Sequence, residues 1–260
     1  MDILWMLPRD DRYVGLVWDN PHVILCILVV YLWFVLKAGP SWMSDRKPMN
    51  LKPVVRVFNL SQVIANVWFS YRAITIAYRH YDEGHFSFGC NPPTSRDDLN
   101  SKEDSEMLVF CGLAYFWVRV LDLLDTVFFV LAKKQSHVSF LHVYHHVVVV
   151  LTFYIYLRSG WSPSLFYVGV LNSIIHIVMY SYYFLSTFPG LRSYLWWKRY
   201  LTAMQIMQFC IIALQLSWNT VFNCGYPAVV CQYNLMQALI FLGLFTKFYV
   251  DSYKHGRKSL

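Results

Sequence analysis

The sequence predicts an all-α membrane protein with seven transmembrane helices, on three observations. The chain is 57% hydrophobic and only 14% charged, whereas a soluble domain carries about 25% charged residues. Seven apolar runs are each long enough to cross a bilayer, which takes about 20 residues in a helix. Basic residues gather in alternate loops between these runs, as they do in membrane proteins. We therefore expect a single transmembrane domain over residues 1–260.

The expected spans follow one another along the whole chain. They lie near 22–37, 54–78, 107–132, 138–157, 164–186, 199–220 and 228–251. The third run contains charged residues, and an alternative with six spans would leave it out. The loop charges alternate correctly only with seven spans, which favours counting the third.

The loop charges also predict the orientation. The loops after spans one, three and five are basic, and so is the tail, whereas the loop 79–106 is acidic. By the positive-inside rule, the tail 252–260 is cytosolic and the N-terminal segment 1–21 lies on the other side. The formal charge of +7 thus reflects topology and does not indicate a nucleic-acid-binding patch.

Two of the six cysteines, Cys90 and Cys224, fall in different loops on the non-cytosolic side. A lumenal compartment permits disulfides, so a Cys90–Cys224 bridge between the loops is one interpretation. Two free thiols are the other.

The fourth run contains a cluster of three histidines, His142, His145 and His146. At about 100° per residue, the three lie within an arc of roughly 100° on a helix. A lone histidine in such a run would more often be a packed core residue. Three on one face indicate a functional site, because ionisable residues inside a membrane are costly.

The third run carries Arg119, Asp122 and Asp125. Each charge costs roughly 2.5–3.5 kcal/mol at the bilayer centre, so we expect all three to face the protein interior. Arg119 and Asp122 are three residues apart and can pair on one helix face. One interpretation is that the pair holds two helices together inside the protein. Another is that it belongs to a network that orients a catalytic imidazole, and the pair can do both.

In spans five and six, polar residues recur at helical spacing, which predicts a polar stripe on each helix. The first stripe contains Asn172, His176, Tyr180 and Tyr183, and the second contains Thr202, Gln205 and Gln208. A purely structural interpretation is interhelical hydrogen bonding, worth about 1 kcal/mol or less per bond.

Four consecutive spans therefore turn polar residues toward a common interior. Basic residues flank it on the predicted cytosolic side: Lys133, Lys134, Lys198 and Arg199. These features predict a pocket that opens to the cytosol, with a cationic rim and an apolar far end. Its expected ligand is an amphiphile with an anionic head and a long hydrocarbon tail, such as an acyl thioester of coenzyme A.

The ordered motifs resemble those of the fatty acid elongases, the membrane condensing enzymes of very-long-chain fatty acid synthesis. The resemblance covers nearly the whole chain. Its motifs are Gly39-Pro40 with Arg46-Lys47-Pro48, the stretches 123–131, 140–146, 176–183 and 194–198, and Thr202 with Gln205 and Gln208. The chain departs from the family in having Arg119 and Asp122 where Lys and Glu are usual, and Ala132 where relatives often have a cation.

The resemblance implies a seven-span protein of the endoplasmic reticulum membrane, with six spans enclosing a substrate tunnel open to the cytosol. It implies a very-long-chain 3-oxoacyl-CoA synthase that joins acyl-CoA and malonyl-CoA, releasing carbon dioxide and CoA. No cofactor or metal is expected beyond these substrates. The implied partners are the reductases and dehydratase of the elongation cycle, and homo- or heterodimers.

The resemblance also assigns roles to residues. His145 is the expected nucleophile, because a neutral imidazole can form an acyl-imidazole, and His176 is the second catalytic residue. His142 and Asn172 would hydrogen-bond substrate oxygens, and Asp122 or Asp125 would orient an imidazole; His146 completes the catalytic set. Residues expected to hold CoA are Arg119, Lys134, His137, Tyr182, Lys198, Thr202 and Gln205.

Two other functions remain as alternatives. A membrane di-iron desaturase or hydroxylase shares the HxxHH pattern, but such enzymes use about eight histidines in three boxes. This chain has 9 histidines, and His22, His80, His85 and His255 lie outside the polar core. A non-catalytic seven-span receptor or transporter would bind without turnover.

Overall fold

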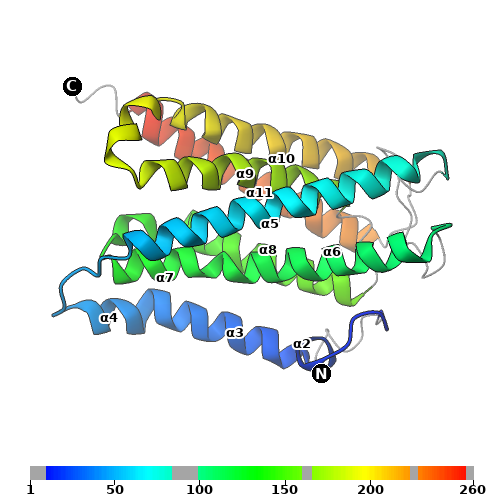
Figure 1. The fold of residues 1–260 in the computed structure, drawn as a ribbon, viewed down its shortest axis with the longest axis horizontal. Helices are drawn as coiled ribbons and strands as arrows, with labels where there is room; N and C mark the ends of the chain where they lie inside the picture. The colour runs from blue at the N-terminus through cyan, green and yellow to red at the C-terminus, as the bar shows by residue number, and fades with distance from the viewer. Residues whose placement is uncertain (1–9, 84–98, 160–165, 223–227, 256–260) are drawn as a thin grey trace. The chain divides into compact units, whose positions relative to one another are not determined.

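A computed structural model describes residues 10–83, 99–159, 166–222 and 228–255, and within these ranges the chain is helical and contains no strand. The α-helices are α2 (Leu16–Asp19), α3 (Pro21–Trp33), α4 (Gly39–Met43), α5 (Lys52–Arg79), α6 (Lys102–Leu121), α7 (Leu123–Leu131), α8 (Phe140–Arg158), α9 (Phe166–Ser186), α10 (Lys198–Val221) and α11 (Ala228–Val250). Figure 1 shows their order along the chain. A π-helical segment, Phe34–Ala38, joins α3 to α4.

Within the described residues, six helical stretches are long and apolar enough to cross a membrane. They are Pro21–Met43, Lys102–Leu131, Phe140–Arg158, Phe166–Ser186, Lys198–Val221 and Cys231–Tyr253. They correspond to six of the seven expected spans, including the charged third one. The expected span at 54–78 is part of α5, whose 28 residues reach about 42 Å. It is long enough to cross, but buried amide side chains make it less apolar than the others, so the count of seven stays a prediction.

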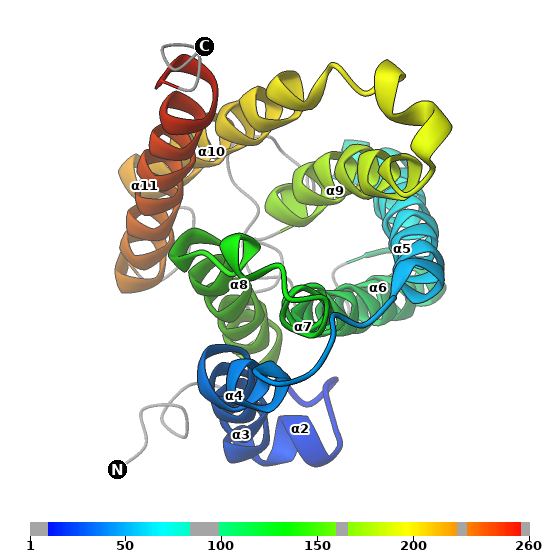
Figure 2. The same cartoon turned by 90° about the vertical axis from the view of Figure 1, so that its left-hand side faces the viewer.

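The helices form two compact units. The first contains residues 1–57 and 106–162, and the second contains residues 58–105 and 163–260. In the first unit α3 and α4 lie beside α7 and α8, as Figure 2 shows. The Tyr31 hydroxyl of α3 and Thr126 of α7 hydrogen-bond at 2.8 Å. Gly39 permits the close approach of α4 to α7, because a Cβ there would lie 2.8 Å from Val130 Cγ1.

The end of α7 is closed by a Schellman motif. The amide of Lys134 donates to the carbonyl of Phe129 at 2.8 Å, and that of Lys133 donates to Val130 at 3.0 Å. Lys133 takes a positive φ of 53°, which glycine usually provides at this position. Its Nζ donates to the Ser44 carbonyl at 2.9 Å, so this lysine fastens the turn to the end of α4.

In the second unit, α10 and α11 pack side by side along their length, as both ribbon views show. Their contact is apolar, with the ring of Phe209 5.4 Å from that of Phe241 and 5.1 Å from that of Phe245. Ile212, Leu216 and Ala238 form a buried cluster in the same pair.

Helices α5 and α9, also in the second unit, run antiparallel. The ring of Phe58 meets that of Tyr180 edge-on at 6.0 Å. This contact lies near the start of α5. Eleven residues further along α5, Cζ of Phe69 lies 3.4 Å from the position of a Cβ added to Gly169 of α9. The two contacts are eleven residues apart on each helix, so they define a single register along the pair.

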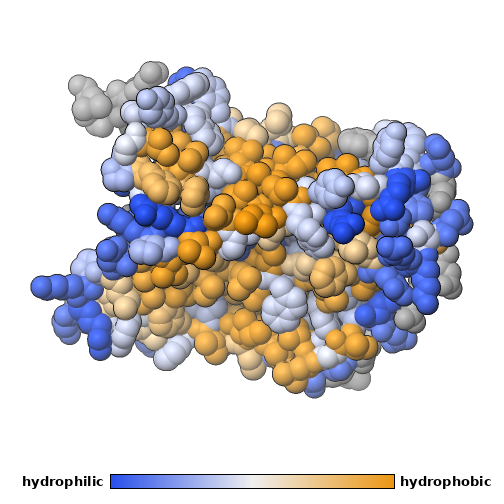
Figure 3. Space-filling model, in the orientation of Figure 1, coloured by the Kyte–Doolittle hydropathy of each residue, from blue (hydrophilic) through white to orange (hydrophobic). Residues whose placement is uncertain are grey.

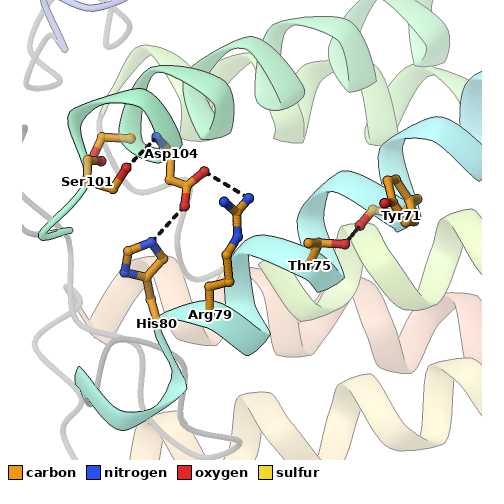
Figure 4. A network of polar contacts seen from close by, with 7 residues as sticks. Tyr71, Thr75, Arg79, His80, Ser101 and Asp104 are labelled. Carbon is orange, nitrogen blue, oxygen red and sulfur yellow. Dashed lines mark hydrogen bonds and ion pairs between the residues drawn. The ribbon is translucent and has the colours of Figure 1, made fainter.

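A polar network ties the end of α5 to the start of α6 (Figure 4). His80 Nε2 lies 2.9 Å from one oxygen of Asp104, and the Arg79 guanidinium lies 3.0 Å from the other. His80 and Asp104 are each 5% exposed. The buried carboxylate thus receives two partners, as a charge removed from water requires.

The surface drawn in Figure 3 has apolar side chains over the middle of the helices and polar ones toward their ends. This is the pattern that a bilayer favours, with its hydrocarbon core between two polar layers. Cys90 and Cys224 lie outside the described residues, as do 1–9 and 256–260, so the proposed bridge and both ends of the chain stay predictions.

Candidate functional site

The histidine cluster lies in the first two turns of α8. Ser139 is the N-cap residue, and its hydroxyl accepts a hydrogen bond from the backbone amide of His142 at 3.3 Å. This satisfies one of the amides that every helix start leaves open. The cap fixes where the helix begins, and thereby which way the imidazoles after it project.

The three imidazoles lie on one face, as the spacing predicts. The ring centroids of His142 and His146 are 4.3 Å apart, and those of His145 and His146 are 5.7 Å apart. His146 is buried, and the other two are half-buried. His142 Nε2 is buried and has no hydrogen-bond partner among the described residues. Within those residues, no three His, Cys, Asp or Glu side chains are grouped to hold a metal ion.

The expected ion pair of the third span is present and buried. Arg119 Nη1 lies 3.0 Å from Asp122 Oδ2, and the two side chains are 1% and 4% exposed. The guanidinium also stacks over the ring of Tyr115 at 4.8 Å. Arg119 lies within electrostatic range of His145 and His146. Asp122 is the N-cap residue of α7, and Asp125, in the first turn of that helix, is half-buried.

The turn between α7 and α8 brings two more expected residues near the cluster. His137 and His142 flank the ring of Phe129, with centroids at 5.0 and 5.5 Å. His137 and Lys134 are both exposed, which suits contact with a ligand that arrives from solvent. Lys133, in contrast, is engaged with the Ser44 carbonyl.

In the second unit, α9 carries the other expected catalytic residue. His176 is 7% exposed and Asn172 is 9% exposed. The ring of His176 lies 5.6 Å from that of Tyr180, which is fully buried. The predicted stripe of Asn172, His176 and Tyr180 is therefore an interior face, whereas Tyr183, expected with them, is 39% exposed.

The expected CoA-binding residues of the second unit fall into two groups. Thr202 is buried and shares a 3.4 Å contact with the Tyr253 hydroxyl, and Gln205 donates to the sulfur of Met179 at 3.6 Å. Tyr182 packs edge-on against Trp197 at 4.9 Å, and Lys198 beside it is exposed at the start of α10. The first group is internal and the second lies at the helix ends.

The structure adds a polar face that the sequence analysis overlooked. Asn59, Gln62, Asn66 and Ser70 are 1%, 2%, 1% and 6% exposed; we call them the α5 polar face. Their spacing of three, four and four is helical and was available in the sequence. It was overlooked because uncharged amides in a run otherwise suited to crossing a membrane are chemically inconspicuous beside histidines and charges.

The structure thus has helices of membrane-crossing length, three histidines on one helix face and a buried ion pair. These features define an integral membrane protein with ionisable side chains in its interior. The family model described as "ELO: GNS1/SUR4 family" matches residues 16–259. The chain is 35% identical over 242 residues to very long chain fatty acid elongase 4 of Homo sapiens, covering 92% of this chain and 74% of that one. It is 30% identical over 253 residues to very long chain fatty acid elongase 5 of Tachysurus fulvidraco, covering 96% and 82%. The chain belongs to the GNS1/SUR4 family of fatty acid elongases.

Proposed function

We propose that this protein is a condensing enzyme of fatty acid elongation, which joins an acyl-CoA to malonyl-CoA to give a 3-oxoacyl-CoA two carbons longer. Family membership supports the role in elongation. The observation that carries the chemistry is the imidazole cluster on α8, capped by Ser139 and flanked by the buried Arg119–Asp122 pair. The proposed location is the endoplasmic reticulum membrane, with a cytosolic C-terminus.

In the proposed mechanism, a ring nitrogen of His145 attacks the carbonyl carbon of the acyl thioester. The carbon–sulfur bond breaks, CoA leaves as a thiolate that takes up a proton, and an acyl-imidazole remains. Malonyl-CoA then loses carbon dioxide, and the resulting enolate attacks the acyl carbon. The new carbon–carbon bond forms as His145 is released.

The other proposed residues support these two steps. His176 acts on the enolate or the acyl carbon, and His142 and Asn172 donate to substrate oxygens on which negative charge develops. Asp122 or Asp125 fixes an imidazole tautomer, and His146 completes the cluster. The proposed CoA contacts are Arg119, Lys134, His137, Tyr182, Lys198, Thr202 and Gln205.

The reaction is tested by incubating microsomes from expressing cells with malonyl-CoA and a panel of acyl-CoAs, and identifying products by mass spectrometry. We expect 3-oxoacyl-CoA, or the elongated acid after the later steps. Binding of acyl-CoA without any product would favour a receptor or transporter. Metal analysis of the purified protein addresses the oxygenase alternative, for which iron would be stoichiometric.

The covalent step has its own test. Purified protein incubated with acyl-CoA alone should release CoA and gain the mass of the acyl group on a peptide from residues 138–157. Steady-state kinetics should be ping-pong. His176→Ala should block product, and early CoA release is expected to survive. Sequential kinetics, with no CoA released until malonyl-CoA binds, would reject the acyl-imidazole while leaving the condensing function intact.

A further inference from the structure

Three buried polar atoms of the α5 polar face have no hydrogen-bond partner among the described residues: Asn59 Nδ2, Gln62 Oε1 and Ser70 Oγ. The side chains of Asn59 and Gln62 are 1% and 2% exposed. A buried donor or acceptor left unpaired costs about 1–3 kcal/mol, and water is scarce at membrane depth. A donor and an acceptor within one helical turn therefore favour a ligand that supplies an acceptor and a donor at matching spacing.

The register between α5 and α9 shows where Asn59 and Gln62 lie along α5 relative to the residues of α9. Phe58 lies against Tyr180 and Phe69 against Gly169. Gln62 is four residues after Phe58, and His176 is four residues before Tyr180, so the two lie level in an antiparallel pair. The same register places Asn66 level with Asn172. Asn59 is three residues before Gln62, and so about 4.5 Å nearer the Lys52 end of α5.

Gln62 and His176 also face each other in azimuth. At about 100° per residue, Gln62 is within roughly 40° of Phe58 and of Phe69, the α5 residues that contact α9. His176 is within roughly 40° of Gly169 and Tyr180, the α9 residues that contact α5. Both side chains are therefore on the contacting faces of their helices, at the same level.

The proposed substrate has complementary chemistry. Beyond its thioester sulfur, the pantetheine arm of CoA carries two secondary amides separated by two methylene groups, each with one N–H and one C=O. If the thioester carbonyl reaches the level of His176, an arm that runs along α5 toward the Lys52 end passes the level of Gln62 and then that of Asn59. The loop after span one is basic, and the positive-inside rule places that end on the cytosolic side.

We propose that Asn59 and Gln62 bind the pantetheine arm of the CoA substrate. Gln62 Oε1 accepts from the amide N–H nearest the thioester, and Asn59 Nδ2 donates to an amide carbonyl further along the arm. This inference rests on the proposed function for its ligand. It adds α5 to the substrate-binding helices and makes the two amides positioning residues for the thioester.

The test compares two probes on the purified protein in detergent: CoA, and adenosine 3′,5′-bisphosphate, which has the nucleotide without the arm. Binding is followed by ligand-induced thermal shift and by titration. Gln62→Met and Asn59→Leu remove the polar groups at similar volume. Gln215→Met is the matched control. Gln215 is also a buried glutamine, at 6% exposure, and it lies toward the Val221 end of α10.

We expect Gln62→Met and Asn59→Leu each to bind CoA about tenfold more weakly, with affinity for the bisphosphate unchanged. Without ligand, their unfolding temperature should stay the same or rise, because an unpaired buried group has been removed. Gln215→Met should bind both probes like the wild type. In steady-state assays the two α5 variants should raise KM for acyl-CoA.

Two outcomes would overturn the proposal. Wild-type affinity for CoA in both α5 variants, with a lowered unfolding temperature, would show that the amides serve the packing of α5 alone. An equal loss for both probes would show a general disturbance of the site. Condensation by the wild type is measured separately. If the wild type forms product but CoA binding does not depend on Gln62, only this inference is rejected. If CoA binding depends on Gln62 but no product forms, only the proposed function is rejected.

Discussion

Helices α8 and α5 both bury polar side chains, but they carry them in different settings. On α8 three imidazoles sit in a run of valines that is apolar enough to cross a membrane. On α5 the buried groups are two asparagines, a glutamine and a serine, and the helix falls short of that apolarity. The α8 cluster carries groups that can react, whereas the α5 face carries only hydrogen-bonding groups. We infer that α8 determines the rate of chemistry and α5 the affinity for substrate.

The largest expected effect is that of His145→Ala, which distinguishes the two helices by kinetic parameter. Loss of the proposed nucleophile should lower kcat at least about a thousandfold and abolish early CoA release. KM for acyl-CoA is the parameter that α5 variants should change. His22→Ala, at an exposed histidine on α3, is the matched control. Substantial turnover by His145→Ala would move the chemistry away from this residue.

Asp122→Ala comes next, because it leaves the buried guanidinium of Arg119 without its carboxylate. Removing one partner of a buried ion pair costs about 3–5 kcal/mol. The variant should accumulate poorly, unfold at a lower temperature and lose activity. Asp45→Ala, at an exposed aspartate, should behave like the wild type. Normal accumulation together with wild-type turnover would show that the pair does not organise the histidine cluster.

Gly169→Leu tests the α5–α9 register on which the pantetheine proposal depends. Phe69 already lies at van der Waals distance from the position of a Cβ, so a large side chain would force the helices apart at a cost of about 1–3 kcal/mol. Gly169→Ala should be nearly neutral. The measurement is thermal unfolding, with KM for acyl-CoA as the second readout. A neutral Gly169→Leu would contradict the register.

Ser139→Ala should have the smallest effect, about 1 kcal/mol of stability, through loss of the α8 N-cap. Because the first turns of α8 carry the histidines, kcat should fall modestly while KM stays near its wild-type value. Ser139→Asp retains a capping oxygen and should restore both stability and kcat. Failure of Asp to rescue would show that the hydroxyl acts in some way other than capping.

The sequence predicted much of the fold because hydropathy and loop charge are properties of short segments. The charged third run is part of a membrane-length helix, as the loop charges predicted, and its Arg119–Asp122 pair forms as the three-residue spacing indicated. The three histidines share a face because α-helical geometry fixes their azimuth. Tyr183 shows the limit of such reasoning: periodicity places it with Tyr180, yet its outer position leaves it 39% exposed.

The lysines after α7 show a second limit. From the sequence, Lys133 and Lys134 are equally suited to a cationic rim on the predicted cytosolic side. Both side chains are exposed, but the Schellman turn gives them different roles, since Lys133 adopts the positive φ and donates to the Ser44 carbonyl. Which of two adjacent cations remains available to a ligand depends on a contact with a segment 89 residues away along the chain.

The sequence alone determined the helical membrane class, the family and the chemically distinctive residues, because bilayer burial and helix periodicity act locally on the chain. The tertiary structure decided which polar groups share a level. The proposed role of Asn59 and Gln62 depends on the antiparallel register of α5 against α9. The contacts of Phe58 with Tyr180 and of Phe69 with Gly169 fix this register. An uncharged amide has little preference of its own for a functional site. Its role depends on what the packed helices place beside it and on whether they leave it a hydrogen-bond partner.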